Sequence, residues 1–243
     1  MKKILSLLLV LALLFSVGAV SAAAQPSFDE LERVVLGEPV AFAAAADETA
    51  DFAWMVEEDG FFLVDTQNPG GGFWITVLCM DDQIIHQGVS FFFSDTWVIA
   101  LAAGEYTLQF SAFDAGREIN ASVIITAKEP HSVTLGQPMT TGQIEVSVFT
   151  FTVEEDGYFW FAYNGGDFFV EVRNSEFELL YTLRMLPLRQ PESRHLPAGE
   201  YALIFTPWPH TFAGSFAPSM IITDTEPLLA PVVLGEWLKH HSV

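Results

Sequence analysis

The sequence of 243 residues contains a single cysteine, Cys79. A chain of this length with one cysteine has no internal disulfide framework, so an apolar core must supply its stability. Cys79 lies inside the apolar run 73–80, where a small buried side chain is the simplest interpretation. A catalytic thiolate would need a partnered histidine, and no motif places one beside it.

Basic residues are also scarce. Ten lysines and arginines stand against 31 acidic residues, which gives a formal net charge of −21 at pH 7. Such a charge repels nucleic acid and anionic membranes, and we expect neither as a partner. The chain is not an acidic disordered tail, because 51% of its residues are hydrophobic and 14% are aromatic. The acidic residues therefore belong on the surface of a protein with a large apolar interior.

Motifs of catalysis and of cofactor binding are missing. The six histidines show no zinc-binding spacing, and no H-E-x-x-H, C-x-x-C or G-x-S-x-G occurs. The glycine cluster 70–72 lacks the lysine of a phosphate-binding loop. We therefore expect a protein that is not an enzyme and that needs no cofactor. A triad assembled from scattered residues is the alternative that the sequence leaves open.

Long apolar runs are confined to the N-terminus. Two lysines precede an apolar run from Ile4 to about Phe15, and small residues follow as far as Ala24. This arrangement predicts a secretory signal peptide over residues 1–24. The apolar run is short for a bilayer span of about 20 residues. We expect cleavage, secretion and no membrane segment afterwards; an uncleaved anchor helix is the alternative.

What the sequence does contain is an internal repeat. The stretch 52–62 (FAWMVEEDGFF) recurs as 149–159 (FTFTVEEDGYF), an offset of 97 residues. Further anchors recur in the same order: Leu-Gly at 36 and 135, Ala-Gly-Glu-Tyr at 103 and 198, and Ile-Ile-Thr at 124 and 221. This period is too long for a solenoid unit and suits two tandem domains. We place them at 30–130 and 131–228.

Apolar and polar residues alternate within each repeat. The residues on one side are Phe52, Trp54 and Val56 in the first repeat, and Phe149, Phe151 and Val153 in the second. Period two is typical of a half-buried strand. Clusters of glycine, asparagine and aspartate separate such runs, which predicts an all-β protein of two antiparallel β-sandwiches, jelly-roll or immunoglobulin-like. We interpret the Glu-Asp-Gly link as a three-residue hairpin with a left-handed glycine.

A third copy of the repeat begins near the C-terminus. The segment 232–236 (VVLGE) is identical to 34–38, and the sequence ends at Val243. An unpaired apolar strand promotes aggregation. We therefore predict that residues 229–243 dock on the second domain or on another chain; a third domain that has been lost is the alternative.

The order of these anchors resembles that of the bacterial pre-peptidase C-terminal domains, a family of extracellular β-sandwiches. The matching residues are Phe52, Val56, Asp59, Gly60, Leu101, Ala103, Gly104, Tyr106 and Leu108, and then Phe149, Phe151, Val153, Asp156, Gly157, Tyr158, Val170, Val172, Leu196, Ala198, Gly199, Tyr201 and Leu203. The resemblance implies an accessory, non-catalytic sandwich. Members of the family often sit beside secreted peptidases, and this chain contains no peptidase.

Two groups of residues are candidate binding sites. Exposed, rigid aromatic rings can stack on sugars or grip a partner, and the candidates are Trp74, Trp97 and Trp208. Core or interdomain packing is their alternative role, and it is the role that we expect for Trp54 and Trp160. Carboxylates beside the repeated glycine are weak candidates for Ca²⁺, namely Glu58, Asp59, Glu155 and Asp156. A solvated turn is the simpler interpretation of these four, and we predict no metal site.

The sequence thus favours a secreted, non-catalytic binding or spacer protein of the bacterial cell exterior, accessory to surface or secreted enzymes. One alternative is a carbohydrate-binding module that uses exposed tryptophans. Another is a remnant or subunit of a larger surface assembly. The expected partner is a protein or a polysaccharide.

Overall fold

Strands make up most of the structure. The computed structural model describes residues 27–45, 48–67, 72–90, 94–113, 117–141, 146–164, 168–185, 191–207 and 219–225. Within these ranges one 3₁₀ turn, Phe28–Glu30, is the only helical element, and no helix has the length and apolar character needed to cross a membrane. The predicted all-β class is confirmed. The predicted signal peptide and the segment 229–243 lie outside the described residues.

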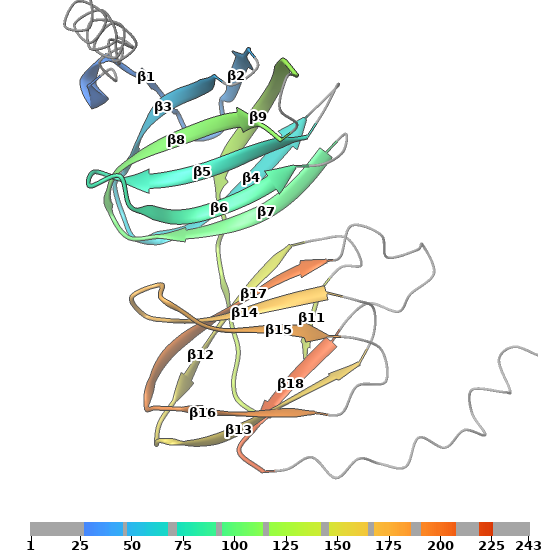
Figure 1. Ribbon diagram of the computed structural model, residues 1–243. Coiled ribbons are helices and arrows are strands. Elements are labelled where there is room, and N and C mark those ends of the chain that lie inside the picture. Colours follow the sequence, from blue (N-terminus) through green and yellow to red (C-terminus); the bar gives the residue numbers. More distant parts are fainter. Residues whose placement is uncertain are drawn as a thin grey trace, which may run out of the picture.

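Strands β1 to β9 of the first repeat form two sheets (Figure 1). Sheet I has the order β1-β3-β8-β5-β6, and sheet II has the order β2-β9-β4-β7. The strands are β1 Glu32–Arg33, β2 Pro39–Ala44, β3 Thr49–Val56, β4 Gly60–Gln67, β5 Phe73–Cys79, β6 Ile84–Ser90, β7 Ser94–Leu101, β8 Gly104–Ala112 and β9 Ile119–Ala127. All pairs are antiparallel except β1 with β3, which is parallel.

The second repeat has the same topology, strand for strand. Sheet III has the order β10-β12-β17-β14-β15, and sheet IV has the order β11-β18-β13-β16. The strands are β10 His131–Ser132, β11 Met139–Thr140, β12 Ser147–Val153, β13 Gly157–Asn164, β14 Phe168–Asn174, β15 Leu179–Met185, β16 Glu192–Leu196, β17 Gly199–Pro207 and β18 Ser219–Thr223. Sheet III therefore corresponds to sheet I, and sheet IV to sheet II.

The repeated stretch 52–62 is not the hairpin that the sequence predicts. Strand β3 pairs with β8 in sheet I, whereas β4 pairs with β7 and β9 in sheet II. The Glu-Asp-Gly link therefore crosses from one sheet to the other. Left-handed φ values occur at Gly37 and Gly136, but not at Gly60. A period-two pattern is the same whether or not consecutive strands pair, so it could not distinguish a hairpin from a crossing.

The Leu-Gly anchors have a clear backbone reason. Gly37 and Gly136 have φ values of +81° and +82°, a conformation that favours glycine. Their amides donate hydrogen bonds of 2.7 and 2.8 Å to the carbonyl oxygens of Ile125 and Ile222. Each glycine thus ties the start of its repeat to the last strand of the same sandwich.

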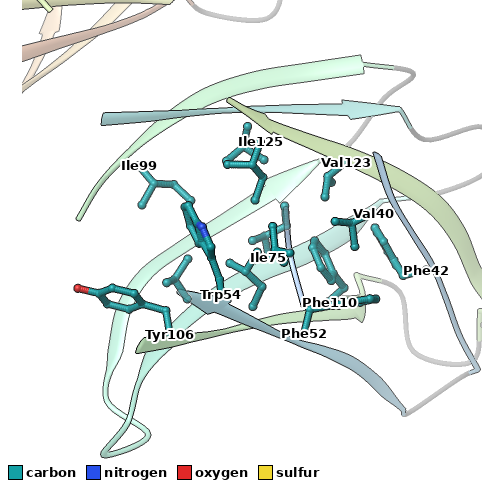
Figure 2. Close-up of a cluster of buried hydrophobic side chains, with 14 of the residues drawn as sticks. Val40, Phe42, Phe52, Trp54, Ile75, Ile99, Tyr106, Phe110, Val123 and Ile125 are labelled. Carbon is teal, nitrogen blue, oxygen red and sulfur yellow. The ribbon is translucent and has the colours of Figure 1, made fainter. Parts of the chain in front are cut away.

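Each sandwich has its own aromatic core. In the first, Trp54 is 1% exposed and meets the Phe62 ring edge-on at 5.0 Å, and the rings of Phe42 and Phe110 stack at 4.1 Å (Figure 2). Phe168 and Phe205 stack at 5.3 Å in the second. Burying side chains of this size contributes about 1.5–3 kcal/mol each. Cys79 is half-buried and unbridged at the edge of the first core, in keeping with a small apolar role.

A third apolar cluster joins the two sandwiches, and we call it the junction. It consists of Phe61, Val98 and Ala100 from the outer face of sheet II, and Val146, Val148, Ala202 and Ile204 from the outer face of sheet III, with Leu63 and Phe177 packed against it. The seven core members are nearly inaccessible to solvent. The repeats are therefore packed against each other, and not only connected by a linker.

The turn between β14 and β15 is adapted to the junction. Phe177 has a left-handed φ of +61°, and its ring meets that of Phe61 edge-on at 5.3 Å. Arg173 Nη1 donates a 2.7 Å hydrogen bond to the Phe177 carbonyl oxygen. The matching turn of the first repeat has Asp82 at this position, with φ +57°. Aspartate tolerates this conformation better than a bulky residue. We infer that the contact with Phe61 offsets the backbone strain at Phe177.

His86 gives this region a predicted pH dependence. Burial lowers its pKa below the usual value near 6.5; Glu171 of the second repeat raises the pKa and Arg173 lowers it. Near and below pH 6.5 the unfolded chain therefore binds more protons than the folded chain does. The free energy of unfolding falls as the pH decreases through that range. We expect chemical denaturation to show a falling free energy of unfolding from about pH 7.5 to about pH 5.5. His86→Gln should flatten this slope and the neighbouring Gln87→Ala should keep it; equal slopes in both variants would contradict the assignment.

Candidate functional site

Of the four outer sheet faces, the junction occupies those of sheets II and III. Figure 1 shows the second sandwich below the β6/β7 side of the first. The outer faces of sheets I and IV contribute no residue to the junction. A ligand that spans several strands therefore has two candidate faces within the described part of the chain.

A row of polar side chains crosses the outer face of sheet I. Asp51 on β3 is opposite Gln109 on β8, Gln109 is opposite Thr76 on β5, and Thr76 is opposite Gln87 on β6. Residues paired in this way point to the same side of a sheet. Gln87 Nε2 donates a 3.4 Å hydrogen bond to Thr76 Oγ1. Asp51 Oδ1 is buried and has no hydrogen-bond partner among the described residues. Thr76 is only 6% exposed, whereas Gln87 is exposed and Gln109 half-buried, so the two glutamines supply the hydrogen-bonding capacity that a ligand can reach.

Trp74 borders this row. It lies on β5, two residues before Thr76, and so points to the same outer face. Its half-buried ring lies 5.4 Å from that of Phe113, with 37° between the ring planes, and Phe113 is 40% exposed. Sheet I thus presents an aromatic pair beside hydroxyl, amide and carboxylate groups.

The other tryptophans have different environments. Trp97 points between the sheets of the first sandwich and packs against its core, and its Nε1 is buried without a hydrogen-bond partner in the described chain. A Cβ added at Gly88 would come within 3.4 Å of the Trp97 ring, which shows how closely β6 covers it. Trp208 lies outside the described residues. Trp160 is half-buried on the outer face of sheet IV and not in the core, because Phe159 and Phe161 take the inward positions.

The acidic turns have a structural role. Asp59 Oδ1 accepts a 2.7 Å hydrogen bond from the Ala103 amide, and Asp156 Oδ1 accepts an equal bond from the Ala198 amide. The two most recognisable motifs, Glu-Asp-Gly and Ala-Gly-Glu-Tyr, therefore meet in space in both repeats. Glu58 and Glu155 are exposed. Over the described ranges no group of three or more His, Cys, Asp or Glu side chains gathers as a metal site would require.

The tyrosines of the Ala-Gly-Glu-Tyr motif complete this corner. The hydroxyl of Tyr106 donates to the Ala102 carbonyl oxygen at 2.9 Å, and that of Tyr201 donates to the Pro197 carbonyl oxygen at 2.6 Å. Burial raises the pKa of both tyrosines above the usual value near 10. The hydroxyls therefore stay protonated, and they hold the turn at any physiological pH.

A cleft of about 640 Å³ opens on the second sandwich, beside sheet IV. Its lining residues are Val133, Thr134, Leu135, Thr152, Glu154, Glu155, Asp156, Gly157, Tyr158, Phe159 and Asp224. Four of them are carboxylates. Tyr158 is 66% exposed, and its ring lies 5.3 Å from that of His195. The sequence did not predict this cleft, because its lining comes from three separate segments of the chain. These are residues 133–135, residues 152–159 and Asp224.

Comparisons with known proteins find only distant structural similarity. No protein-family model and no curated protein matches it. Among solved structures, it is similar to the pre-peptidase C-terminal domain of the collagenase from Bacillus anthracis, with 15% identity over 42% of this chain and 98% of that one, and a TM-score of 0.36.

Other similar structures cover more of the chain at lower identity. The human MASP-1/3 CUB1-EGF-CUB2 domains show 8% identity over 76% of this chain and 99% of theirs, with a TM-score of 0.27. Tripeptidyl peptidase 2 shows 9% identity over 79% of this chain and 24% of its own, with a TM-score of 0.31. One of these three structures belongs to the family that the repeat anchors resemble. Similarities this low leave the function to be argued from the geometry of the chain itself.

Proposed function

We propose that the chain is a non-catalytic binding protein of the cell exterior, accessory to surface or secreted enzymes, and that it holds a neutral polysaccharide on the outer face of sheet I. The observation that carries the proposal is the row Asp51, Gln109, Thr76 and Gln87 bordered by Trp74. Sugar rings present an apolar face to an aromatic ring and hydroxyl groups to polar side chains. The outer face of sheet I offers both, side by side.

Charge narrows the class of ligand. At a net charge of −21 the protein repels polyanions, and salt screens exposed charges only beyond about 8 Å at physiological ionic strength. A neutral polysaccharide avoids this repulsion. The four residues of the row lie on four neighbouring strands, and strands are spaced about 4.8 Å apart. The face therefore suits an extended chain of sugars better than a single small molecule.

The same face argues for binding and not for hydrolysis. Hydrolysis of a glycosidic bond normally uses a pair of carboxyl groups separated by about 5–9.5 Å. The polar row contributes one carboxylate, Asp51. Glu105 on β8 shares this face, but it is opposite Met55, four residues along β3 from Asp51, which places the two carboxyl groups about 13 Å or more apart. A binding module needs no such pair.

Trp74→Ala should weaken retention on an insoluble neutral polysaccharide, such as cellulose or β-1,3-glucan, by about tenfold, because the stacking surface is lost. Sedimentation assays with the full chain measure this retention. Tyr158→Ala removes a more exposed aromatic ring from the second repeat and should leave retention unchanged. If the wild-type chain is not retained by any neutral polysaccharide, or if both variants lose retention equally, the proposal is wrong.

The junction favours a second function. An apolar interface with nearly inaccessible side chains holds the two sandwiches in one orientation. A protein built in this way can act as a spacer that keeps two partners at a set distance. This function predicts a single rigid particle in solution. Small-angle scattering of the wild type and of variants of the junction tests this prediction.

A further inference from the structure

Exposed apolar side chains gather at the end of sheet I where the chain turns from β5 to β6. Figure 1 shows this turn at the left end of the first sandwich. Six of the ten exposed large apolar side chains of the described residues lie at this end, and each is between 42% and 73% exposed. They are Val35, Leu36, Met55, Met80, Ile84 and Ile85. Soluble proteins rarely expose a group of apolar side chains of this kind unless the surface binds something.

Strand pairing places two methionines on either side of a carboxylate. Met55 on β3 is opposite Glu105 on β8. Tyr106 is opposite Cys79, the last residue of β5, so the next residue, Met80, is level with Glu105. Neighbouring strands are about 4.8 Å apart. The positions of the two methionines are therefore about 10 Å apart, with the half-buried Glu105 between them.

The apolar surface continues toward both edges of the sheet. The Val34 amide donates a 2.8 Å hydrogen bond to the Ala53 carbonyl oxygen, which extends the parallel ladder of β1 and brings Val35 beside Met55. On the other side, Ile84 begins β6, the strand next to β5. A band of apolar side chains thus crosses five strand positions, a width of about 19 Å. We call it the methionine band, and its members are Val35, Met55, Met80 and Ile84.

The fold does not require the methionine band. The second repeat has the same strand topology without it. There, the matching positions beside β10, on β12 and after β14 carry exposed polar residues, namely Thr134, Thr152 and Ser175. Only the position of Ile84 keeps an apolar residue, Leu179. The apolar side chains of the first repeat therefore serve a purpose other than the folding of a sandwich.

Charge decides what can cover the methionine band. Glu105 lies within it, and further carboxylates follow β3 at 57–58 and occupy the turn at 81–82, against one exposed cation, Arg33 on β1. A second copy of the chain would bring the same carboxylates together across a symmetric contact. An anionic membrane is repelled by the net charge of −21. A protein with basic residues among its apolar ones is attracted to the same surface.

The spacing within the band indicates the shape of this partner. Residues i and i+7 on one face of an α-helix are about 10.5 Å apart, and residues i+3 and i+4 lie between them on the same face. Apolar residues at i and i+7 can therefore cover Met55 and Met80 while a lysine or arginine between them reaches Glu105. Methionine side chains adapt readily to the shape of an apolar partner.

We propose that the methionine band docks an amphipathic helix of another protein, with apolar residues at i and i+7 and a lysine or arginine midway. The apolar residues of the helix pack on Met55 and Met80, and its cation pairs with the Glu105 carboxylate. Trp74 is six residues before Met80, about 20 Å away along β5. One sheet can thus hold a polysaccharide at one end and a protein at the other. The inference goes beyond the polysaccharide site and does not depend on it.

Fluorescence anisotropy with the full chain and labelled synthetic peptides tests the proposal. The probe is a helical peptide with leucine at i and i+7 and lysine at i+3 and i+4. One counterpart has glutamate for lysine, and the other has serine for leucine. The wild-type chain should bind the probe at least about tenfold more tightly than either counterpart, because each lacks half of the complementary chemistry. Failure to bind the probe, or equal binding of the leucine and serine peptides, would overturn the proposal.

Variants locate the bound peptide. Met55→Thr and Met80→Ser install the residues of the second repeat, so the first sandwich should keep its fold. The double variant should bind the probe about tenfold more weakly. Leu179→Ser removes a 50% exposed apolar side chain from the second repeat and should leave the affinity unchanged. If the double variant binds as tightly as the wild type, the peptide sits elsewhere on the acidic surface and the proposal is wrong.

Light scattering distinguishes a protein partner from a second copy of the chain. The wild type should be a monomer, as the carboxylates of the band repel those of another copy. A dimer that dissociates in the Met55→Thr, Met80→Ser double variant would assign the band to a second copy and contradict the proposal. None of these variants alters Trp74, so a negative result here leaves polysaccharide binding untouched, and loss of retention in Trp74→Ala leaves peptide binding untouched.

Discussion

Replacing Ile204 with aspartate should separate the two repeats. Ile204 is a core member of the junction and is 1% exposed. A buried carboxylate without a partner costs about 3 kcal/mol or more, and opening the junction is the easiest way to hydrate it. Calorimetry should then show two unfolding transitions where the wild type shows one. Small-angle scattering should show a larger radius of gyration.

Two further variants calibrate this result. Thr182→Asp introduces the same charge at an exposed position on sheet III and should preserve a single compact particle. Phe177→Asp installs the residue that the first repeat has at the matching left-handed position, so the turn should survive while the contact with Phe61 is lost. We expect it to weaken the junction by about 1–2 kcal/mol, less than Ile204→Asp does. An Ile204→Asp protein with the compactness and the single transition of the wild type would show that the sandwiches do not depend on the junction.

Replacing Asp156 with alanine should destabilise the second sandwich by about 1.5–3 kcal/mol, nearer the lower figure because the hydrogen bond is exposed to solvent. Asp156 Oδ1 accepts the 2.7 Å bond from the Ala198 amide, which holds the crossing between sheets III and IV against the turn before β17. Removing the carboxylate leaves both segments without this connection. Urea denaturation monitored by fluorescence measures the loss.

The neighbouring carboxylate provides the control for Asp156. Glu155→Ala removes an exposed acidic residue from the same turn and should change stability by less than about 0.5 kcal/mol. Asp156→Asn keeps an oxygen that can accept from the Ala198 amide and should fall between the two. Asp59→Ala should affect the first sandwich in the same way, through the Ala103 amide. Equal losses in Asp156→Ala and Glu155→Ala would contradict the structural role.

The alternation of apolar residues was sufficient to predict the class of fold. Phe52, Trp54 and Val56 face the core as expected, because a strand with one buried side must place every second residue inward. Recurrence of a glycine was not sufficient to predict its backbone conformation: Gly37 and Gly136 have positive φ values, whereas Gly60, for which a left-handed conformation was predicted, does not. The alternation is a local signal, and a local signal is complete in the sequence.

The candidate sites could be predicted only in part. Trp74 lies on an outer face and Trp97 between the sheets, although both stand in apolar runs of similar composition. The residue opposite each ring decides its environment, and that residue comes from another strand. The aspartates of the repeated turns were visible as a motif, but their partners, the amides of Ala103 and Ala198, are more than 40 residues away.

By itself, then, the sequence determined the β class, the tandem repeat, the acidic surface and the residues that must be buried somewhere. Only the tertiary structure decided that β3 and β4 belong to different sheets, and that Phe61 is buried by the second repeat while Tyr158 is open. The first half of strand β4 is apolar on both sides, which predicts that both of its faces are buried. The sequence does not show which part of the protein covers the outer face. The surface that covers this face comes from a segment far away in the chain. Which surface packs there depends on how well its shape fits and on how little hydration its residues lose.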